Sequence, residues 1–305
     1  MNRREITSPH NPLLRQLRRW VDKPKQCRAD NVLLADGVHL VQEAFAAGLE
    51  GLDLLVDVER SGAGRLGGPS DEISALLEEA DARGVPVHVL PAKLFRDVSP
   101  VETPQGILGV FRRPPAPSLD LGGAVPAAGA ERLHDARPPR DPLEAGRAAS
   151  ERVHAGAPWL VACGVQDPSN LGAMLRTARA TGVTQLLTSH GTVDPFHHRA
   201  LRAAMGATFR MSVHADLRAD ELEAHVKSAG LRSVALSADG DTPLESLDPH
   251  EPVALYFGSE GSGLPAEVAS SVDVHVRIPM EPGTESLSVP AAAAVCLYWL
   301  YLGRR

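Results

Sequence analysis

Cysteine and aromatic residues are scarce in this 305-residue sequence. Phe, Trp and Tyr together make up only 4% of it, and Cys27, Cys163 and Cys296 stand alone without a CxxC spacing. Isolated cysteines in odd number indicate reduced, buried thiols rather than a disulfide framework or a zinc site. We therefore expect a cytoplasmic protein.

Long apolar runs are missing too. No run approaches the ~20 residues of a membrane-spanning helix, and the polar start Met1-Asn-Arg-Arg-Glu5 does not have the pattern of a secretory signal. The 12 histidines are scattered, and the one adjacent pair, His197-His198, would point apart on a helix. We therefore expect no membrane association and no metal site.

Basic residues are in the minority overall but are concentrated in two stretches. The net charge is −7, yet residues 1–30 hold eight Lys or Arg against three acidic residues. Residues 166–210 hold five Arg against two Asp, whereas acidic residues collect between Asp216 and Glu251. Two basic stretches on an acidic protein are typical of polyanion binding on one face, here by Arg15, Arg18, Arg19, Arg199 and Arg202. For the N-terminal stretch alone, a solvated helix face is an alternative explanation.

The pattern of apolar residues predicts two α/β domains joined by a linker. Residues 1–111 are expected to form a small domain with helices at 11–22, 38–47, 71–83 and 92–97 and strands at 32–35, 52–58, 85–90 and 106–111. Residues 112–157 are rich in Pro, Ala and Gly without periodicity and are predicted to be a flexible linker.

In residues 158–305 predicted strands and helices alternate. The strands are expected at 159–165, 184–189, 209–214, 231–237, 253–258 and 273–278, and the helices at 171–181, 197–205, 219–229, 265–271 and 287–302. Such alternation predicts a mostly parallel sheet with helices on both faces.

The stretch around which the second domain is organised begins at Pro252. A strand with Val253, Leu255 and Phe257 ends abruptly in Gly258, and Gly261 and Gly263 follow. Glycines at the carboxyl end of a parallel strand leave room for a ligand, which is where open α/β sheets bind one. The alternative is an ordinary strand-to-helix turn.

A second junction of this kind follows the strand that ends at Ile278. A Pro-Met turn and a polar loop lead to a helix that opens at Ser286 or Ser288 and tolerates Pro290 in its first turn. If the two junctions lie side by side, they make one cofactor pocket.

A further motif follows the strand expected at 159–165. Asp167-Pro-Ser169 has the residue types that favour a turn, and Ser169 or Asn170 could cap the next helix. Gly172 would let a ligand approach, and Arg176 lies four residues on, above Gly172 on the same face. An arginine so placed suits a phosphate or ribose, although a surface arginine on an amphipathic helix is the alternative.

One glycine pattern points to a different class of protein. Residues 62–67 match G-x-G-x-x-G, the dinucleotide fingerprint. Three residues separate the pattern from its strand, however, and the helix begins only near Asp71, whereas the fingerprint needs a tight turn. A nicotinamide or flavin oxidoreductase is therefore the weakest of the hypotheses.

Together the motifs resemble the SpoU (TrmH) family of RNA ribose 2′-O-methyltransferases. The resemblance covers 158–302 and rests on three motifs in order: Asn170-x-Gly-x-x-x-Arg176, Phe257-Gly-Ser-Glu-Gly-Ser-Gly-Leu264, and Ile278-Pro-Met280 with Glu285-Ser-Leu-Ser-Val289. More weakly, residues 4–111 resemble the ribosomal-protein-like RNA-binding domain that often precedes such a domain.

The resemblance implies a fold, a cofactor and roles for residues. It implies a sheet with a deep C-terminal trefoil knot, a homodimer with the active site near the subunit interface, and S-adenosylmethionine bound in the knot. Arg176 matches the catalytic arginine, Asn170 and Glu260 would support the site, and Ser286 would lie against substrate and cofactor. The implied cofactor-binding residues are Gly258, Ser259, Gly261, Ile278, Met280, Leu287 and Ser288.

Two departures from the family pattern concern Ser288 and the first domain. Ser288 stands where the family has Asn, which removes an amide's paired donor and acceptor, and Asp36-Gly37 stands where Glu-Gly is usual. The favoured hypothesis is a ribose 2′-O-methyltransferase that acts on ribosomal RNA, with transfer RNA second. The alternative is a catalytically weak or inactive RNA-binding relative with the same fold.

Overall fold

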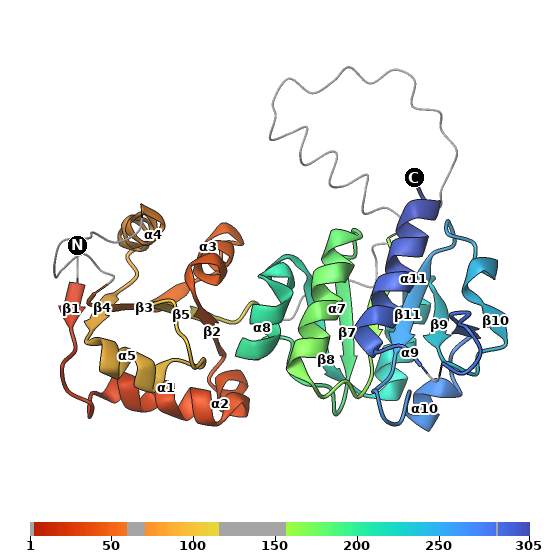
Figure 1. Cartoon of the computed structure of the whole chain (residues 1–305), viewed down its shortest axis with the longest axis horizontal. Helices are drawn as coiled ribbons and strands as arrows, with labels where there is room; N and C mark the ends of the chain where they lie inside the picture. Colours follow the sequence, from red (N-terminus) through yellow and green to blue (C-terminus); the bar gives the residue numbers. More distant parts are fainter. Residues whose placement is uncertain (1–2, 60–70, 116–156, 285) are drawn as a thin grey trace, which may run out of the picture. The chain divides into compact units, whose positions relative to one another are not determined.

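The structure is a computed structural model that describes residues 3–59, 71–115, 157–284 and 286–305. The contacts within it divide the described chain into two compact units (Figure 1). The first consists of the chain up to Pro115 together with Pro195–Arg210, and the second of the remainder. Most of the linker expected at 112–157 and the glycine pattern at 62–67 lie outside the described residues.

The first unit contains a five-stranded mixed sheet in the order β1-β4-β3-β5-β2. Strands β1 (Arg3–Glu5), β4 (Val87–Leu90) and β3 (Gly51–Asp57) are parallel, and β5 (Ile107–Arg112) runs antiparallel to both β3 and β2 (Val32–Asp36). The short edge strand β1 was not expected from the sequence, and the other four were.

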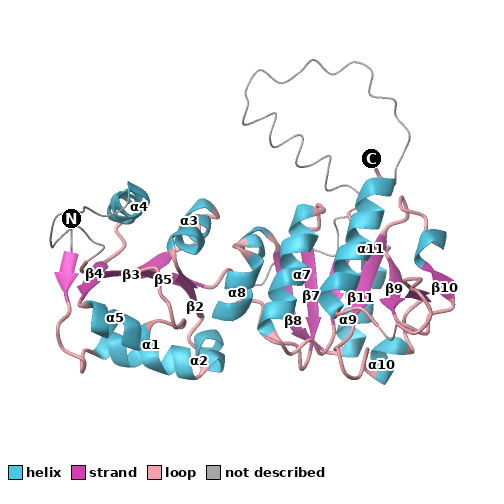
Figure 2. Ribbon diagram, viewed as in Figure 1, coloured by secondary structure: helices cyan, strands magenta, loops and turns pink. Residues whose placement is uncertain are grey.

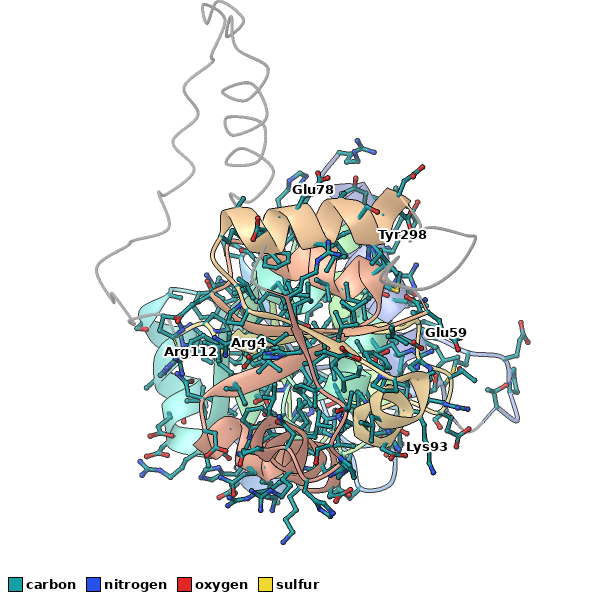
Figure 3. The ribbon with its side chains drawn as sticks, turned by 90° about the vertical axis from the view of Figure 1, so that its left-hand side faces the viewer. Arg4, Glu59, Glu78, Lys93, Arg112 and Tyr298 are labelled. Atoms are coloured by element: carbon teal, nitrogen blue, oxygen red, sulfur yellow. The ribbon has the colours of Figure 1, made fainter. Side chains whose placement is uncertain are left out.

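Five helices cover this sheet on its two faces (Figure 2). Helices α1 (Pro12–Asp22), α2 (Pro24–Ala29) and α5 (Ala92–Val98) lie on one face, and α3 (Val38–Ala46) and α4 (Asp71–Ala82) lie on the other. Glu78 of α4 and Lys93 of α5 accordingly point away from opposite sides of the sheet (Figure 3). Of the five helices, only α2 was not predicted.

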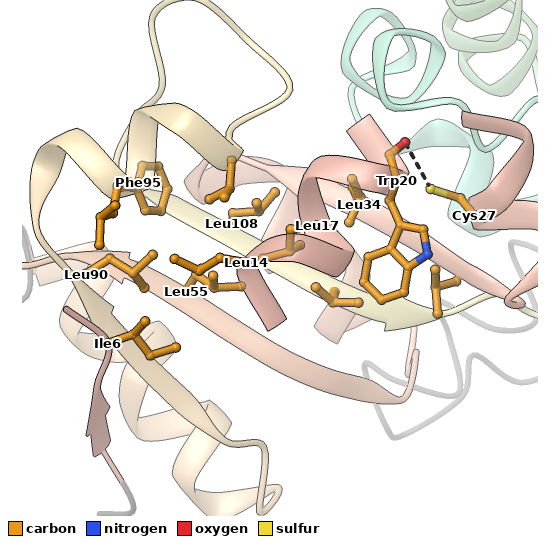
Figure 4. Close-up of a cluster of buried hydrophobic side chains, with 14 residues drawn as sticks. Ile6, Leu14, Leu17, Trp20, Cys27, Leu34, Leu55, Leu90, Phe95 and Leu108 are labelled. Carbon is orange, nitrogen blue, oxygen red and sulfur yellow. Dashed lines mark hydrogen bonds between the residues drawn. The ribbon is translucent and has the colours of Figure 1, made fainter. Parts of the chain in front are cut away.

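The core of the first unit follows from the alternation of its strands. Leu34 and Leu108 face α1, α2 and α5, where Leu14, Leu17 and Phe95 are buried (Figure 4). Because successive strand residues point to opposite faces of a sheet, the buried residues next to Leu34 and Leu108 in their strands point to the other face. There Phe45 of α3 meets Phe111 of β5 edge-on, with ring centroids 5.2 Å apart.

The segment Pro195–Arg210 packs with the first unit, although the sequence analysis places residues 158–305 in one domain. Its helix α8 (His198–Ala204) contacts the edge strand β2. Arg210 Nε donates to Glu43 Oε2 at 2.9 Å, and the His39 ring bonds to the Met205 carbonyl at 3.3 Å. An edge strand exposes unpaired backbone groups, so covering it with a helix protects it.

Two sequence expectations in this segment were wrong. A 3₁₀ turn occupies Ala207–Arg210, so the strand expected at 209–214 is β8 (Ser212–Leu217) instead. The rings of His197 and His198 stack at 4.3 Å between centroids rather than pointing apart. The reason is that His197 is the N-cap and lies outside the helix, where its side chain accepts from the Arg199 amide.

The second unit contains a seven-stranded sheet in the order β10-β12-β9-β11-β6-β7-β8, in which every pairing is parallel. Its strands are β6 (Trp159–Ala162), β7 (Gln185–Ser189), β8, β9 (Arg232–Leu236), β10 (Thr242–Pro243), β11 (Val253–Phe257) and β12 (Val274–Arg277). The α/β class with a parallel sheet is therefore confirmed, and only the two-residue β10 was not expected.

Helices pack on both faces of this sheet. Leu222 and Val226 of α9 (Ala219–Ser228) and Val268 of α10 (Ala266–Ala269) are buried against one face. On the other, α7 (Pro168–Ala180) packs against α11 (Val289–Gly303), so the helix that follows β6 lies beside the last helix of the chain (Figure 1). None of the helices in the described ranges is long and apolar enough to cross a membrane.

Candidate functional site

A pocket of about 530 Å³ lies within the second unit, at the carboxyl ends of β9, β11 and β12. This volume is in the range of small-molecule sites, and the position is where parallel sheets bind ligands. Of the cofactor-binding residues expected from the sequence, those that line the pocket are Gly258, Ser259, Gly261, Ile278, Met280 and Leu287. Glu260 and Ser286, expected to act in catalysis, line it as well.

The two junctions expected side by side are in fact separated by β9. Strand β11 pairs with β6 on one edge and with β9 on the other, and β12 pairs with the far edge of β9. The loop after β9 therefore completes the pocket, through Ser237, Ala238 and Asp239. Sequence reasoning missed these residues because periodicity places strands along the chain but does not order them in a sheet.

The loop after β9 is held against β12. Arg277 Nη1 donates to the carbonyl oxygens of Gly240 and Asp241 at 2.7 and 2.8 Å. A Cβ at Gly240 would lie 2.6 Å from the Val276 carbonyl carbon, so only glycine lets this loop lie on the strand. A glycine three residues after the strand predicted at 231–237 was the signal that could have drawn attention to this loop.

The loop after β11 turns back on itself. The Ser259 amide donates to the Gly263 carbonyl at 2.9 Å, and the Gly263 amide returns a bond to Ser259 at 3.0 Å. A Cβ at Gly258 would lie 2.1 Å from the Gly263 carbonyl carbon. Gly258 is thus required by the loop's own backbone, a constraint that the sequence did not indicate. At Gly261, in contrast, a Cβ would have nothing within 4 Å.

The third wall comes from the start of α11. Leu287 is 37% exposed although it lines the pocket, so part of its apolar surface is open. Ser288 is the N-cap of α11, makes no side-chain capping bond and is not among the residues that line the pocket. Glu285 of the third motif lies outside the described residues.

Helix α7 brings the first motif to the rim of this pocket. The Asn170 side-chain amide donates to the Glu260 carboxylate, which joins α7 to the loop after β11. The helix begins at Pro168 and is capped by Asp167, whose Oδ1 accepts from the Ser169 amide at 2.7 Å, and not by Ser169 or Asn170 as expected. A short acidic side chain before an N1 proline is a common cap.

The two other residues of the first motif differ in exposure. Gly172, expected to admit a ligand, is instead buried in α7, the helix that packs against α11. Arg176 is exposed and forms no hydrogen bond or ion pair with another described residue. It lies six residues beyond Asn170, a rise of about 9 Å along the helix.

The basic residues expected to bind RNA all belong to the first unit. Arg15 and Arg19 are exposed on α1, and Arg18 donates to the Pro9 carbonyl at 2.8 Å. Arg199 and Arg202 are exposed on α8. Arg210, counted in the second basic stretch, is paired with Glu43 instead.

Arg202 lies near a buried carboxyl group. Burial raises the pKa of Asp36 to about 6, while a hydrogen bond from Ser99 and the positive charge of Arg202 act in the opposite direction. The positive charge of Arg202 therefore favours the ionised form of Asp36, while the Arg202 side chain itself stays exposed.

Two family models match the chain. Residues 158–298 match the SpoU rRNA Methylase family, and residues 11–109 match the MRM3-like substrate binding domain. The first match contains all the residues that line the pocket, and the second contains the basic helix α1 of the first unit.

Several proteins are similar to this chain over nearly its whole length. The 23S rRNA (guanosine(2553)-2′-O)-methyltransferase RlmP of Bacillus subtilis is 28% identical over 300 residues, which cover 97% of this chain and 99% of the relative. A crystal structure of an RNA 2′-O ribose methyltransferase has a TM-score of 0.70 at 25% identity and 99% coverage of both chains. The AdoMet-bound rRNA methyltransferase from Sinorhizobium meliloti has the same fold, with a TM-score of 0.74 at 23% identity and 98% coverage of both chains.

The two glycines of the β11 loop should respond differently to a methyl group. We expect Gly258→Ala to lower the free energy of unfolding by about 2 kcal/mol or more, because its Cβ overlaps backbone atoms that cannot move aside singly. Gly261→Ala, in the same loop, should change it by less than about 0.5 kcal/mol. Denaturant titration followed by circular dichroism measures both, and equal stabilities for the two variants would contradict the loop geometry.

Proposed function

Because the chain belongs to the SpoU rRNA methylase family, we propose that it transfers a methyl group from S-adenosylmethionine to a ribose 2′-hydroxyl of RNA. The observation that carries this proposal is the pocket at β9, β11 and β12 with the Asn170–Glu260 bond at its rim. Ribosomal RNA is the proposed substrate, with transfer RNA second, since the full-length similarity is to an enzyme named for 23S rRNA.

The pocket fits the proposed cofactor in size and in chemistry. Phe257, Ile278 and Leu287 offer apolar surface, while Ser237 and Ser259 offer hydroxyl groups. A large ligand with a flat apolar ring and several polar groups requires such a mixed lining. When bound, S-adenosylmethionine supplies a methyl group on a positively charged sulfur that leaves readily.

Leu287 provides a test of cofactor binding that spares the fold. We expect Leu287→Ala to weaken S-adenosylmethionine binding about five-fold or more, because a partly exposed side chain loses apolar contact with the ligand. Isothermal titration calorimetry measures the affinity. Met205→Ala, at a side chain of similar exposure in the first unit, is the matched control and should leave the affinity unchanged. An unchanged affinity in Leu287→Ala would remove this wall from the cofactor site.

The residues of the first motif have separate roles in the proposed reaction. The Asn170–Glu260 bond fixes α7 against the loop after β11, so that Arg176 is held at a constant distance from the pocket. An arginine guanidinium stays protonated in proteins and so does not readily take up a further proton, but it binds phosphate through two parallel hydrogen bonds. We therefore assign Arg176 to holding an RNA phosphate, which aligns the ribose hydroxyl, and Ser286 to contact with the substrate at the mouth of the pocket.

Substitution of Arg176 tests whether the protein is an enzyme or an RNA-binding protein without activity. We expect Arg176→Ala to lower methyl transfer about 100-fold or more while S-adenosylmethionine binding is retained, because substrate alignment is lost. Arg176→Lys should recover little, because a lysine lacks the planar fork. Arg179→Ala, three residues further along α7, is the matched control.

The assay is transfer of labelled methyl groups to RNA that lacks the native modification, followed by mapping of nuclease-resistant linkages. Wild-type activity in Arg176→Ala would show that the assignment is wrong. Binding of cofactor and RNA without any methyl transfer in the wild-type protein would favour the alternative, an inactive RNA-binding relative.

We also propose that the C-terminal segment is threaded through a trefoil knot. In support, β11 lies in the middle of the sheet between β9 and β6, and α11 returns to pack on α7. The chain thus re-enters a region that earlier strands have already formed. Threading of this kind is rare among folds.

Homodimer formation through α11 completes the proposed assembly. No charged residue occurs from Val289 to Gly303, and Val295, Tyr298 and Leu302 are 41%, 54% and 53% exposed. These three are spaced as one stripe of a helix. A helix that is apolar on all sides is normally covered on all sides, so its exposed stripe suits a second copy of the chain.

Tyr298→Asp tests the dimer. A charge in the centre of an apolar interface should shift the protein from dimer to monomer and lower methyl transfer, because the site is proposed to lie near that interface. Sedimentation velocity measures the change, with Ser270→Asp, at the exposed C-cap of α10, as control. A monomeric wild-type protein would contradict this part of the proposal.

A further inference from the structure

The helices on the two faces of the first unit's sheet carry opposite charge. The basic layer is Pro12–Asp30, which contains α1 and α2, together with α5. It holds eight Lys or Arg and three Asp. Its basic residues are Arg15, Arg18, Arg19, Lys23, Lys25, Arg28, Lys93 and Arg96.

The acidic layer consists of α3 and α4 on the opposite face. These helices hold six acidic residues and no Lys or Arg. The acidic residues are Glu43, Asp71, Glu72, Glu78, Glu79 and Asp81. The separation is invisible in the sequence, because α5 lies some seventy residues beyond α1 and joins it only through the fold, in which the two helices pack together.

The arginines of α1 and the two basic residues of α5 form no ion pair with a described carboxylate. Arg18 and Arg19 donate to the Pro9 carbonyl and the Gln26 side-chain oxygen, and Arg96 donates to the Ala92 carbonyl of its own helix. Arg15 and Lys93 form no hydrogen bond or ion pair with another described residue. All these acceptors are uncharged, so the positive charge remains available to a partner.

The carboxylates near these cations are few, and one is already engaged. Asp30 accepts hydrogen bonds from Trp20, Gln16 and Gln26. The bonds, led by that from Trp20, and the positive charge of Arg19 lower its pKa. On the opposite face, in contrast, Arg83 at the end of α4 is paired with Glu79 at 2.6 Å.

We infer that RNA lies across the basic layer, and that Lys93 and Arg96 of α5 contact its phosphates together with Arg15, Arg18 and Arg19 of α1. This inference rests on the proposed function and locates its substrate on the first unit. Phosphate contacts of this kind hold RNA in place without reading its sequence. The acidic layer repels the same polyanion, so only one face of the sheet can be turned toward RNA.

The test compares two double variants of the full-length protein. Lys93→Gln with Arg96→Gln removes two unpaired cations of α5. Arg83→Gln with Lys227→Gln, the matched control, removes one Arg and one Lys that are each paired with a Glu four residues earlier. Arg15→Gln, Arg18→Gln and Arg19→Gln together serve as the reference on α1. The probe is a fluorescently labelled 30-nucleotide RNA hairpin, whose binding is measured by anisotropy at several salt concentrations.

The α5 variant should bind the hairpin about five-fold more weakly than wild type. Its slope of log affinity against log salt should be smaller by about 1.4 to 1.8, which corresponds to two lost phosphate contacts. The control should match wild type in both, and S-adenosylmethionine binding should be unchanged in every variant, because the pocket lies in the second unit. Circular dichroism shows that each variant is folded.

Three outcomes overturn the inference. They are an α5 variant with the affinity and slope of wild type, a control that weakens binding equally, and α5-dependent binding to phosphatidylserine vesicles without binding to the hairpin. Methyl transfer is measured in parallel so that the two proposals are separated. If transfer occurs but binding is insensitive to α5, only this inference fails. If binding depends on α5 but no methyl is transferred, only the proposed function fails.

Discussion

Strand β11 is hydrogen-bonded on both edges, to β9 and to β6, and the site of the second unit depends on this pairing. A strand in the middle of a parallel sheet is buried on both faces, and all five residues of β11 are buried. Its end is therefore fixed by two neighbours. The loop that follows can approach a ligand only because it leaves from so rigid a point.

In each of two loops at this edge of the sheet, a glycine lies so close to other backbone that no side chain would fit. After β11, the chain folds back so tightly that Gly258 has no room for a side chain beside Gly263. After β9, Gly240 lies directly on the backbone of β12, and the Arg277 guanidinium binds the loop carbonyls. In both, the glycine serves contacts within the protein, and Gly258 lines the pocket as well.

The sequence was sufficient to place most helices and strands, because alternation in strands and the 3.6-residue period in helices are local properties. It was also sufficient to predict the pocket residues that follow β11 and β12, because these residues belong to motifs that are contiguous in the sequence. It did not reveal the loop after β9, since strand order is set by pairing between residues far apart in the chain. The capping of α7 by Asp167 and the burial of Gly172 likewise depend on the local turn and on the packing of α11, which periodicity does not describe.

The distribution of charge shows why the net charge of −7 is a poor guide to the partner of this protein. Interactions between exposed charges are screened beyond about 8 Å at physiological salt, so a polyanion responds to the surface it touches and not to the total. The fold collects unpaired cations of α1 and α5 on one face of a sheet and the carboxylates of α3 and α4 on the other. In the proposed RNA complex, an acidic protein attracts RNA to one face of the sheet and repels it from the opposite one, so the same separation of charge would also orient the RNA.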